Sequence, residues 1–227
     1  MQVKLVSYSQ PTAEFAALGL INVQELIAYC ARVSNPSNQI NSETSARLIK
    51  YLIKNAHWSP LEMVSACVEI ETTRDIARQI LRHKSFSFQE FSQRYSDPTK
   101  DFNFVVRDAR LQDNKNRQNS IDLDPNNAEH ARISREWSEK QAEVFALVQE
   151  HYTWAIAQGI AKEQARAILP EGNTVSKLYI NGTIRSWIHF LQLRTGNGTQ
   201  LEHQLVAKAC ALAISAIFPM GNDLVPQ

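Results

Sequence analysis

Residues 64–70 read Val-Ser-Ala-Cys-Val-Glu-Ile, with an apolar side chain at every second position. In an extended chain, successive side chains point to opposite faces, so this stretch would present one apolar and one polar face. We therefore predict a half-buried β-strand here. Thr73, a few residues later, can cap a helix that would run from about Arg74 to Arg82. A strand that leads straight into a helix indicates a fold of mixed type.

The sequence before this strand predicts one more strand and two helices. Residues 2–8 alternate briefly between apolar and polar side chains, which indicates a short strand. Asn22, followed by Glu25, has the spacing of a helix N-cap pair and predicts that a helix begins there. A polar loop over residues 32–41 would then lead to a second helix over about 42–55, whose apolar residues lie on one face.

The sequence after the strand predicts mainly helices. Residues 85–88 alternate again but are few, and residues 97–135 are polar and rich in turn formers, which predicts a long loop with little core. Apolar residues at helical spacing then predict four helices, over 137–158, 162–169, 183–193 and 201–218. The chain has no internal repeat and no linker rich in Gly or Ser. We expect one α+β domain over residues 1–227, with a small, mostly antiparallel sheet and several long helices.

Charge and composition exclude some classes of protein. Lys and Arg number 24 and Asp and Glu number 23, so the formal net charge of +1 argues against a globally basic nucleic-acid-binding protein. No apolar run approaches the roughly 20 residues that a membrane span needs. The start of the chain lacks the apolar core of a signal peptide. We expect a cytoplasmic protein whose partners include neither a membrane nor nucleic acid.

The cysteines and histidines form no metal-binding or disulfide pattern. Cys30, Cys67 and Cys210 lie far apart, without a Cys-x-x-Cys pair, so we expect reduced thiols with no activating neighbour. The chain has no His-Glu-x-x-His motif and no other set of His and carboxylate residues with ligand spacing, so we expect no metal. The histidines that no motif includes are interpreted as structural: His130, His151 and His203.

Residues 78–95 carry the strongest chemical signal and read Arg-Gln-Ile-Leu-Arg-His-Lys-Ser-Phe-Ser-Phe-Gln-Glu-Phe-Ser-Gln-Arg-Tyr. On a helix, Gln79, Arg82 and His83 would share one face and present an amide, a guanidinium and an imidazole together. Residues 74–94 include five basic and two acidic side chains. Such a cluster suits anionic phosphates, which arginine binds through two parallel hydrogen bonds.

Two other interpretations of this stretch stay open. A solvated basic surface would read the same, and so would a nucleotide- or RNA-binding module without catalysis, since phenylalanines alternate with the polar groups. The acidic Glu90 within the patch and the near-zero net charge argue against RNA binding. A site that holds a planar ring and phosphates needs aromatic and cationic side chains together, and residues 86–94 supply both.

Several motifs of the chain resemble those of the flavin-dependent thymidylate synthases. The family signature, Arg-His-Arg followed after seven residues by Ser, is similar to residues 82–92, and the family's Glu-x-Ser-x-Arg-Tyr matches residues 90–95. The family's His-x-x-Pro-apolar-Glu resembles residues 57–62, and its Glu-x-x-Arg-x-x-Leu-Pro resembles residues 163–170. Its Arg-x-x-x-[Asn/His]-Phe-x-x-x-Arg helix resembles residues 185–194. The chain is identified as a member of this family because these motifs occur together and in the family's order.

Four positions depart from the family pattern. Lys84 replaces the last arginine of the signature, which keeps the charge and loses the planar guanidinium. Gln89 and Thr183 stand where the family often has asparagine, and Gly198 stands where it often has histidine. These positions bear on the affinity for FAD, and they leave open the alternative of a relative that has lost activity.

The resemblance implies a reaction and a set of roles. The reaction is the reductive methylation of dUMP to dTMP, with bound FAD, NADPH or NADH as reductant, and 5,10-methylenetetrahydrofolate as carbon donor. The resemblance also implies a homotetramer with active sites at the subunit interfaces. The residues implied to line the dUMP site are Gln79, Arg82, Glu90, Phe91, Ser92, Gln93, Arg94 and Arg166. The residues implied to contact FAD are Ser59, Arg82, His83, Lys84, Glu90, Thr183, Arg185 and His189, with His57 on the folate or flavin side.

Arg194 and Ser92 are the residues implied to take part in catalysis. Arg194 would lie beside the uracil ring, where a fixed cation stabilises the negative charge that develops on activation. We interpret Ser92 as a hydroxyl that positions dUMP, because a nucleophilic serine needs an adjacent general base that the sequence does not place. Without the motifs, we would interpret His57 as a histidine in a turn and His189 as a histidine in the core. Arg194 would be a cation that interacts with the dipole at a helix end.

Overall fold

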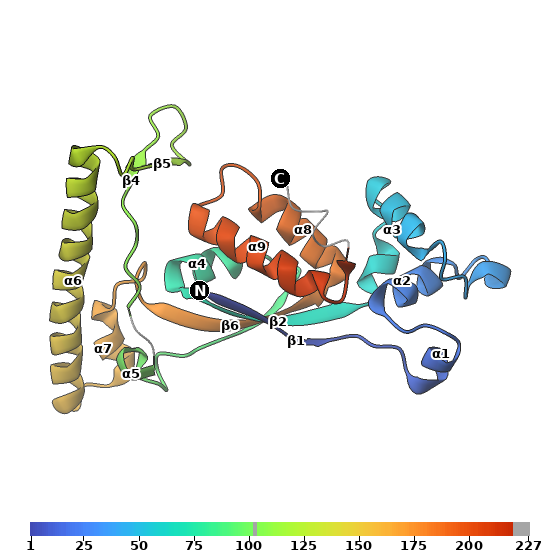
Figure 1. Ribbon diagram of the computed structural model, residues 1–227. Coiled ribbons are helices and arrows are strands. Elements are labelled where there is room, and N and C mark those ends of the chain that lie inside the picture. Colours follow the sequence, from blue (N-terminus) through green and yellow to red (C-terminus); the bar gives the residue numbers. More distant parts are fainter. Residues whose placement is uncertain (102–103, 220–227) are drawn as a thin grey trace.

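A four-stranded antiparallel sheet forms the centre of the protein (Figure 1). The computed structural model describes residues 1–101 and 104–219. The strands lie in the order β1-β2-β6-β3, and every neighbouring pair is antiparallel, which confirms the predicted α+β class with a small antiparallel sheet. The four strands are β1 (Gln2–Tyr8), β2 (Ser65–Thr73), β3 (Ser87–Glu90) and β6 (Val175–Thr183).

The strand predicted at residues 64–70 is β2, which pairs with β1 on one side and with β6 on the other. Ala66, Val68 and Ile70 are fully buried, whereas the side chains between them are partly exposed on the opposite face. The alternation in the sequence therefore corresponds to two different environments, a packed face and a polar face. The prediction of a half-buried strand is confirmed.

The strand β6 is missing from the sequence-based predictions, although it pairs with β2 along its whole length. A serine and a glycine at positions that face the core weaken the apolar alternation by which a strand is recognised. The strand β3 also begins two residues later than the predicted 85–88, because Phe86 packs on Gly182 before the ladder with β6 begins. The buried side of β6 is made by Ser176, Leu178, Ile180 and Gly182.

Three helices cover one face of the sheet (Figure 1). They are α4 (Arg74–Ile80), α8 (Ile184–Arg194) and α9 (Leu201–Ser215), the last of which ends earlier than predicted. Between helices and sheet lies the fully buried Trp187, whose Nε1–H donates to the backbone oxygen of Ala66 at 3.1 Å. This bond satisfies the single polar atom of the indole and ties α8 to the central strand.

The end of α4 differs from the prediction in a way that matters for the site. The helix ends at Ile80, so Arg82 and His83 lie beyond it and do not share a helical face with Gln79. The chain turns at this point, with the amide of His83 donating to the backbone oxygen of Ile80 at 3.0 Å. The three side chains are therefore positioned by a helix and the turn after it.

The N-terminal helices lie beside one end of the sheet (Figure 1). Asn22 caps α2 as predicted, and its side-chain oxygen accepts from the amide of Glu25 at 3.0 Å. The helix α3 begins three residues after the predicted start at 42, and the unpredicted α1 has no buried side chain that could reveal it. The elements here are α1 (Ala13–Ala17), α2 (Val23–Ala31), η1 (Pro36–Asn38), α3 (Ser45–Lys54) and η2 (Ser59–Glu62).

The other end of the sheet carries the long helix α6, and here the predicted loop over 97–135 is wrong. The loop region contains a paired hairpin, β4–β5, and α6 begins inside it at Ala128, capped by Asn127. The first turns of α6 are charged and mostly exposed, so they lack the apolar period that reveals a helix. The elements are α5 (Pro98–Asp101), β4 (Arg110–Gln112), β5 (Ser120–Asp122), α6 (Ala128–Ala157), α7 (Lys162–Ala165) and η3 (Arg166–Ile168).

The helix predicted over 162–169 is divided into α7 and the 3-10 turn η3. Across residues 1–101 and 104–219, no helix combines the length and the apolar character that crossing a membrane requires.

We expect Gly182→Ala to lower the free energy of unfolding by about 1–3 kcal/mol, the usual effect of overpacking a core. A Cβ at this position would lie 2.4 Å from Cδ1 of Phe86. The ring of Phe86 is held in place by Trp187 and Phe190, with centroids 4.8 and 6.0 Å away. The measurement is urea unfolding, with Gly172→Ala as the control because nothing lies within 4 Å of its added Cβ. Equal unfolding free energies for the two variants would contradict this account of β6.

Candidate active site

The ends of α8 and of the turn after α4 meet, and the contact joins two of the sequence motifs. Arg194, the last residue of α8, donates from Nε to Nε2 of His83 at 2.9 Å. His83 is buried, and the rings of Phe190 and Phe86 lie against it with centroids 5.0 and 6.4 Å away. Burial first, and then the nearby cations, lower the pKa of His83 to about 4. The imidazole is therefore neutral at pH 7 and accepts the hydrogen bond from the guanidinium.

Two cations, Arg82 and Arg194, lie in this corner of the molecule, near the ends of two helices. The C-terminal ends of α4 and α8 both contribute partial negative charge from their last carbonyl groups. Burial first, and then the charge of Arg82, lower the pKa of Arg194. Arg82 is exposed and Arg194 is partly buried, so two guanidinium groups act on each other through a partly desolvated region. Arg82, His83 and Arg194, all predicted site residues, are thus brought together.

A second polar contact lies beside the first and involves α9. Oε1 of Gln79 lies 3.1 Å from Nδ1 of His203, and Nε2 of Gln79 donates to Oε1 of Gln200 at 2.8 Å. His203 is 0% exposed, and its Nε2 atom has no hydrogen-bond partner among the described residues. Burial first, and then the charges of Arg194 and His83, lower the pKa of His203 to about 3. His203, interpreted from the sequence as structural, contacts a predicted dUMP residue.

Glu90, at the end of β3, is surrounded by cationic groups. Its Oε2 atom lies 3.0 Å from Nη1 of Arg78, and its Oε1 atom lies 3.7 Å from Nη1 of Arg74 and accepts from the hydroxyl of Ser176 at 3.0 Å. Both arginines also face Glu171, at 3.7 and 3.3 Å. Burial first, and then the charge of Arg78, lower the pKa of Arg74. Neither arginine was selected as a site residue, although both belong to the basic stretch.

The motif at 90–95 meets the motif at 163–170 at the side chain of Glu163, whose backbone oxygen also binds Arg166 of its own motif. Oε2 of Glu163 lies 3.1 Å from Nη2 of Arg94, and its backbone oxygen accepts from Nε of Arg166 at 3.3 Å. The Oγ atom of Ser92 accepts from the amide of Arg94 at 3.3 Å. No histidine or carboxylate of the described residues hydrogen-bonds to the Ser92 hydroxyl. The contact between these two motifs lies at the α7 end of the molecule (Figure 1).

Three predicted site residues near these motifs, and the departure Gln89, differ in their surroundings. The amide of Phe91 donates to the backbone oxygen of Lys177 at 2.8 Å, which continues the pairing of β3 with β6. Gln93 is buried, and its Nε2 group has no hydrogen-bond partner among the described residues. Lys84 and Gln89, the two departures from the family pattern in this stretch, are exposed.

A cleft of about 350 Å³ lies between η2 and α8. Arg185 forms an ion pair with Glu62 in it, and this contact joins the motif at 57–62 to the motif at 185–194. The cleft combines an aromatic ring, hydroxyl groups, a guanidinium and an imidazole. Its lining residues are Trp58, Glu62, Ser85, Arg185, Ser186, His189 and Gln192.

Three other residues predicted to contact the flavin or folate do not line this cleft. Thr183 caps α8, and its Oγ1 atom accepts from the amide of Ser186 at 3.3 Å. Ser59 is exposed at the start of η2. His57 is not among the lining residues and packs against Tyr51, with ring centroids 5.8 Å apart.

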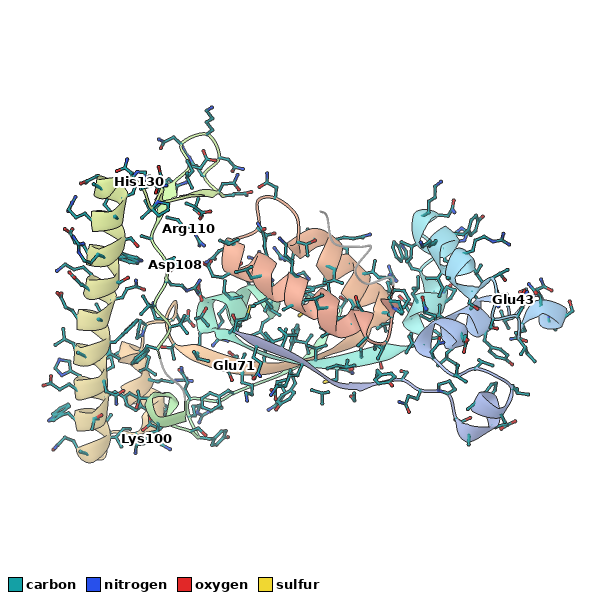
Figure 2. All side chains as sticks on the ribbon, viewed as in Figure 1. Glu43, Glu71, Lys100, Asp108, Arg110 and His130 are labelled. Carbon is teal, nitrogen blue, oxygen red and sulfur yellow. The ribbon has the colours of Figure 1, made fainter. Side chains whose placement is uncertain are left out.

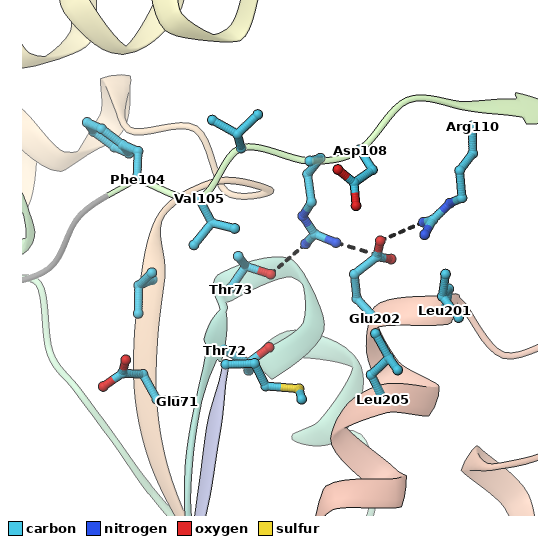
Figure 3. Close-up of a pocket in the computed structure, with 14 residues that line it drawn as sticks. Glu71, Thr72, Thr73, Phe104, Val105, Asp108, Arg110, Leu201, Glu202 and Leu205 are labelled. Atoms are coloured by element: carbon cyan, nitrogen blue, oxygen red, sulfur yellow. Dashed lines mark hydrogen bonds and ion pairs between the residues drawn. The ribbon is translucent and has the colours of Figure 1, made fainter. Parts of the chain in front are cut away.

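A larger cavity of about 430 Å³ lies between the end of β2, the segment before β4 and the start of α9 (Figure 3). Arg107 bridges Asp75 and Glu202, with nitrogen–oxygen distances of 2.7 and 3.1 Å. Arg110 pairs with Glu202 at 2.6 Å. Figure 2 shows Asp108 and Arg110 on the extended segment between α6 and the central helices. No residue predicted from the sequence motifs lines this cavity.

The cysteines are free thiols, as expected, and they lie in positions that disfavour the thiolate. Burial raises the pKa of Cys30, Cys67 and Cys210. Within the described part of the chain, no group of three or more His, Cys, Asp or Glu side chains could hold a metal ion.

We expect the free energy of unfolding to fall as the pH falls from about 6.5 towards 4. The folded-state pKa values of His83 and His203 are about 4 and about 3, below the ordinary 6.5, so in this range the unfolded chain binds protons that the folded chain does not. Each histidine contributes a slope of up to about 1.4 kcal/mol per pH unit. His83→Gln keeps an acceptor for Arg194 and cannot titrate, so urea unfolding at several pH values should give it a flatter slope. Identical slopes for the variant and the natural protein would contradict the prediction.

Comparison with known proteins shows the family to which the chain belongs. The family model described as "Thymidylate synthase complementing protein" matches residues 20–220. A "Probable flavin-dependent thymidylate synthase" of Paramecium bursaria Chlorella virus 1 is 46% identical over 219 residues, and a flavin-dependent thymidylate synthase of Synechocystis sp. is 44% identical over 220 residues; each match covers 96% of both chains. The UMP/dUMP methylase PolB from Streptomyces cacaoi, in its crystal structure with 5-Br dUMP, has the same fold, with a TM-score of 0.75 over 98% of this chain and 93% of that chain at 24% identity. By the family match and these identities, the chain belongs to the family of flavin-dependent thymidylate synthases.

Proposed function

We propose that this chain methylates dUMP to dTMP with the help of a bound flavin. The observation that carries the proposal is the contact of Arg194 with His83, which joins two family motifs 111 residues apart. The neutral His83 orients the guanidinium without cancelling its charge, and no carboxylate of the described residues pairs with Arg194. A fixed, uncompensated cation is what the activation of a uracil ring requires, because negative charge then develops on the ring oxygens.

The proposed dUMP site combines this cation with groups near α7, which in a shared site would come from another chain. Arg94 and Arg166 would bind the phosphate, since each carries a planar guanidinium that can donate two parallel hydrogen bonds, and Arg94 is exposed. Glu163 now pairs with Arg94, so an incoming phosphate would compete with that carboxylate. Ser92 would position the nucleotide through its hydroxyl, to which no histidine or carboxylate in the described part of the chain is hydrogen-bonded. The remaining members of the proposed site are Gln79, Arg82, Glu90, Phe91 and Gln93.

The cleft between η2 and α8 fits a flavin nucleotide in its chemistry. Its indole can stack on a planar ring, and Arg185 and His189 can donate to anionic or carbonyl groups. When bound, FAD supplies the reducing equivalents that turn the transferred one-carbon unit into a methyl group. The ion pair of Arg185 with Glu62 keeps that guanidinium in the cleft. The other residues proposed to hold FAD are Ser59, Arg82, His83, Lys84, Glu90 and Thr183, with His57 on the folate or flavin side.

The proposal includes two co-substrates and a compartment. Reduction of FAD requires a nicotinamide reductant, NADPH or NADH, and the methyl carbon would come from 5,10-methylenetetrahydrofolate. The cytoplasm is the compartment we propose, because three unpaired cysteines suit a reducing environment. The raised pKa values of these thiols also agree with a mechanism that does not use cysteine as a nucleophile.

We infer a homotetramer with shared sites from the separation of the motifs along the sheet. The cleft at η2 and the contact of Arg94 with Glu163 at α7 lie towards opposite ends of the molecule in Figure 1. A nucleotide and a flavin that react together must lie side by side, so a second chain would supply the missing half of each site. Exposed apolar side chains of α6, such as Leu147 at 55% and Trp154 at 59%, offer surface for contacts between subunits.

The experiment that tests the function is tritium release from dUMP labelled at the carbon that is methylated. Purified protein is assayed with FAD, reduced nicotinamide and methylenetetrahydrofolate, and each component is left out in turn. Release that depends on both FAD and folate supports the proposal. A colourless protein that binds no flavin and releases no tritium would favour the nucleotide-binding alternative.

We expect Ser92→Ala to slow dTMP formation by about 5- to 150-fold, the effect of one lost hydrogen bond to a polar ligand. Arg194→Ala should slow it by about 10²–10³-fold or more, since it removes a preorganised electrostatic group. The measurement is dTMP formed per flavin under saturating substrates. Complete loss of activity in a Ser92→Ala protein that still binds FAD and dUMP would show that Ser92 does more than position the substrate.

We expect two inactive variants, Arg94→Ala and Arg194→Ala, to regain part of the activity when their subunits are mixed after partial dissociation. In a shared site, one chain would supply the intact Arg94 and another the intact Arg194. The measurements are dTMP formation and light scattering on the same mixtures. A fully active monomer would rule out shared sites.

A further inference from the structure

The side chain of Gln79 is held from both sides by a chain of hydrogen bonds that starts at Glu202. Nε2 of Gln200 donates to Oε2 of Glu202 at 2.9 Å, and Oε1 of Gln200 accepts from Nε2 of Gln79 at 2.8 Å. Oε1 of Gln79 lies 3.1 Å from Nδ1 of the fully buried His203. Three of these four residues lie on or next to the first turn of α9, and none was selected from the sequence except Gln79.

The direction of each bond in this chain follows from the charge at its start. A carboxylate accepts hydrogen bonds and donates none, and Glu202 is kept ionised by Arg107 and Arg110 at 3.1 and 2.6 Å. Burial acts to raise the pKa of Glu202, but its hydrogen bonds, to the backbone, Gln200 and Arg110, outweigh burial and lower it. Gln200 must therefore turn its amide nitrogen to Glu202 and its oxygen to Gln79.

The same constraint passes on to Gln79 and His203. Because the oxygen of Gln200 accepts, Gln79 must turn its nitrogen to Gln200 and its oxygen to His203. His203 must then carry its proton on Nδ1, and burial, together with the charges of Arg194 and His83, lowers its pKa to about 3, so it stays neutral with a single ring proton. Gln79 keeps one N–H and one oxygen lone pair for a ligand, and it cannot exchange their places by an amide flip.

We propose that Glu202, Gln200 and His203 are positioning residues that fix the polarity of the Gln79 amide, and that this fixed amide selects a uracil ring over a cytosine ring. The proposal rests on the proposed function, in which Gln79 lines the dUMP site. Uracil presents an N3–H donor between two carbonyl acceptors, whereas cytosine presents an N3 acceptor beside an amino donor. An amide with one free N–H and one free oxygen can match either base only in the matching orientation. A freely rotating amide could pair with either base. A fixed orientation therefore lets the Gln79 amide discriminate between the two.

The test compares the affinities of dUMP and dCMP for the FAD-loaded protein by equilibrium dialysis. In E202Q the carboxylate becomes an amide that can donate or accept, so Gln200 and Gln79 are free to flip. We expect the ratio of the two affinities to fall by roughly tenfold to a hundredfold, the effect of one misplaced hydrogen bond to a polar ligand. The matched control is E129Q, which removes an ion pair with Arg132 on the exposed start of α6.

A double variant distinguishes the effect of the hydrogen-bond direction from the general effect of losing a charge at position 202. In Q200E/E202Q the carboxylate moves to position 200, where it again only accepts, so Gln79 must still turn its nitrogen to it. We expect this variant to recover the preference for dUMP that E202Q loses, although both variants weaken the ion pairs with Arg107 and Arg110. An unchanged affinity ratio in E202Q, or a double variant no more selective than E202Q, would overturn the proposal.

A measurement without any nucleotide distinguishes this proposal from the proposed function. Nitrogen NMR of the histidine rings in the natural protein should show His203 with its proton on Nδ1 at pH 7, the less common form of free histidine. E202Q should show a mixture of the two tautomers. A proton on Nε2 of His203 in the natural protein would refute the proposed chain of hydrogen bonds, whether or not dUMP binds. Failure to bind dUMP, with His203 protonated on Nδ1, would instead refute the proposed function.

Discussion

The pairing of β2 with β6 fixes where the proposed catalytic side chains can be. The register places Thr73 opposite Val175 and Ser65 opposite Thr183, so the helices that follow the two strands begin at opposite ends of the ladder. Both helices cover the same face of the sheet and therefore approach each other (Figure 1). The ends of α4 and α8 meet, and the bond from Arg194 to His83 is the result. A shift of this register by one residue would turn the core faces of both strands outwards, so the site and the core depend on the same pairing.

The elements that could be predicted from the sequence are those whose own residues carry the signal. β2 alternates cleanly because its core face is apolar at Ala66, Val68 and Ile70. α2 begins at a cap whose two residues, Asn22 and Glu25, are only three positions apart in the chain. β6 has a serine and a glycine on its core face, and the glycine is there because Phe86 occupies the space of a side chain. The start of α6 is stabilised by its cap and by pairs such as Arg132 with Glu136, which leave no apolar stripe.

The residues of the proposed site also differ in whether neighbouring or distant parts of the sequence reveal them. The motifs supplied Arg82, His83 and Arg194, because a family signature is read within a few residues. The partners of a proposed site residue can come from far away in the chain. Gln200 and His203 both contact Gln79 and are 121 and 124 residues from it. Nothing in a single sequence marks such a pair, since neither glutamine nor histidine at these positions breaks a pattern. The sequence therefore predicts candidate site residues, whereas the side chains that hold them are found only in the structure.

The two ends of the proposed nucleotide site differ in how their charges are compensated, and this difference has a functional consequence. Towards α7, the guanidinium of Arg94 is already paired with Glu163, so a phosphate gains only the difference between two anionic partners. At the other end, Arg194 is paired with a neutral imidazole, so its charge remains available in a partly buried setting. Interactions of a charge strengthen as water is excluded. The phosphate end would thus bind the nucleotide with moderate strength, whereas the ring end would respond most strongly when negative charge appears on the uracil during the reaction. Binding energy that is realised mainly in the transition state raises the rate without trapping the substrate.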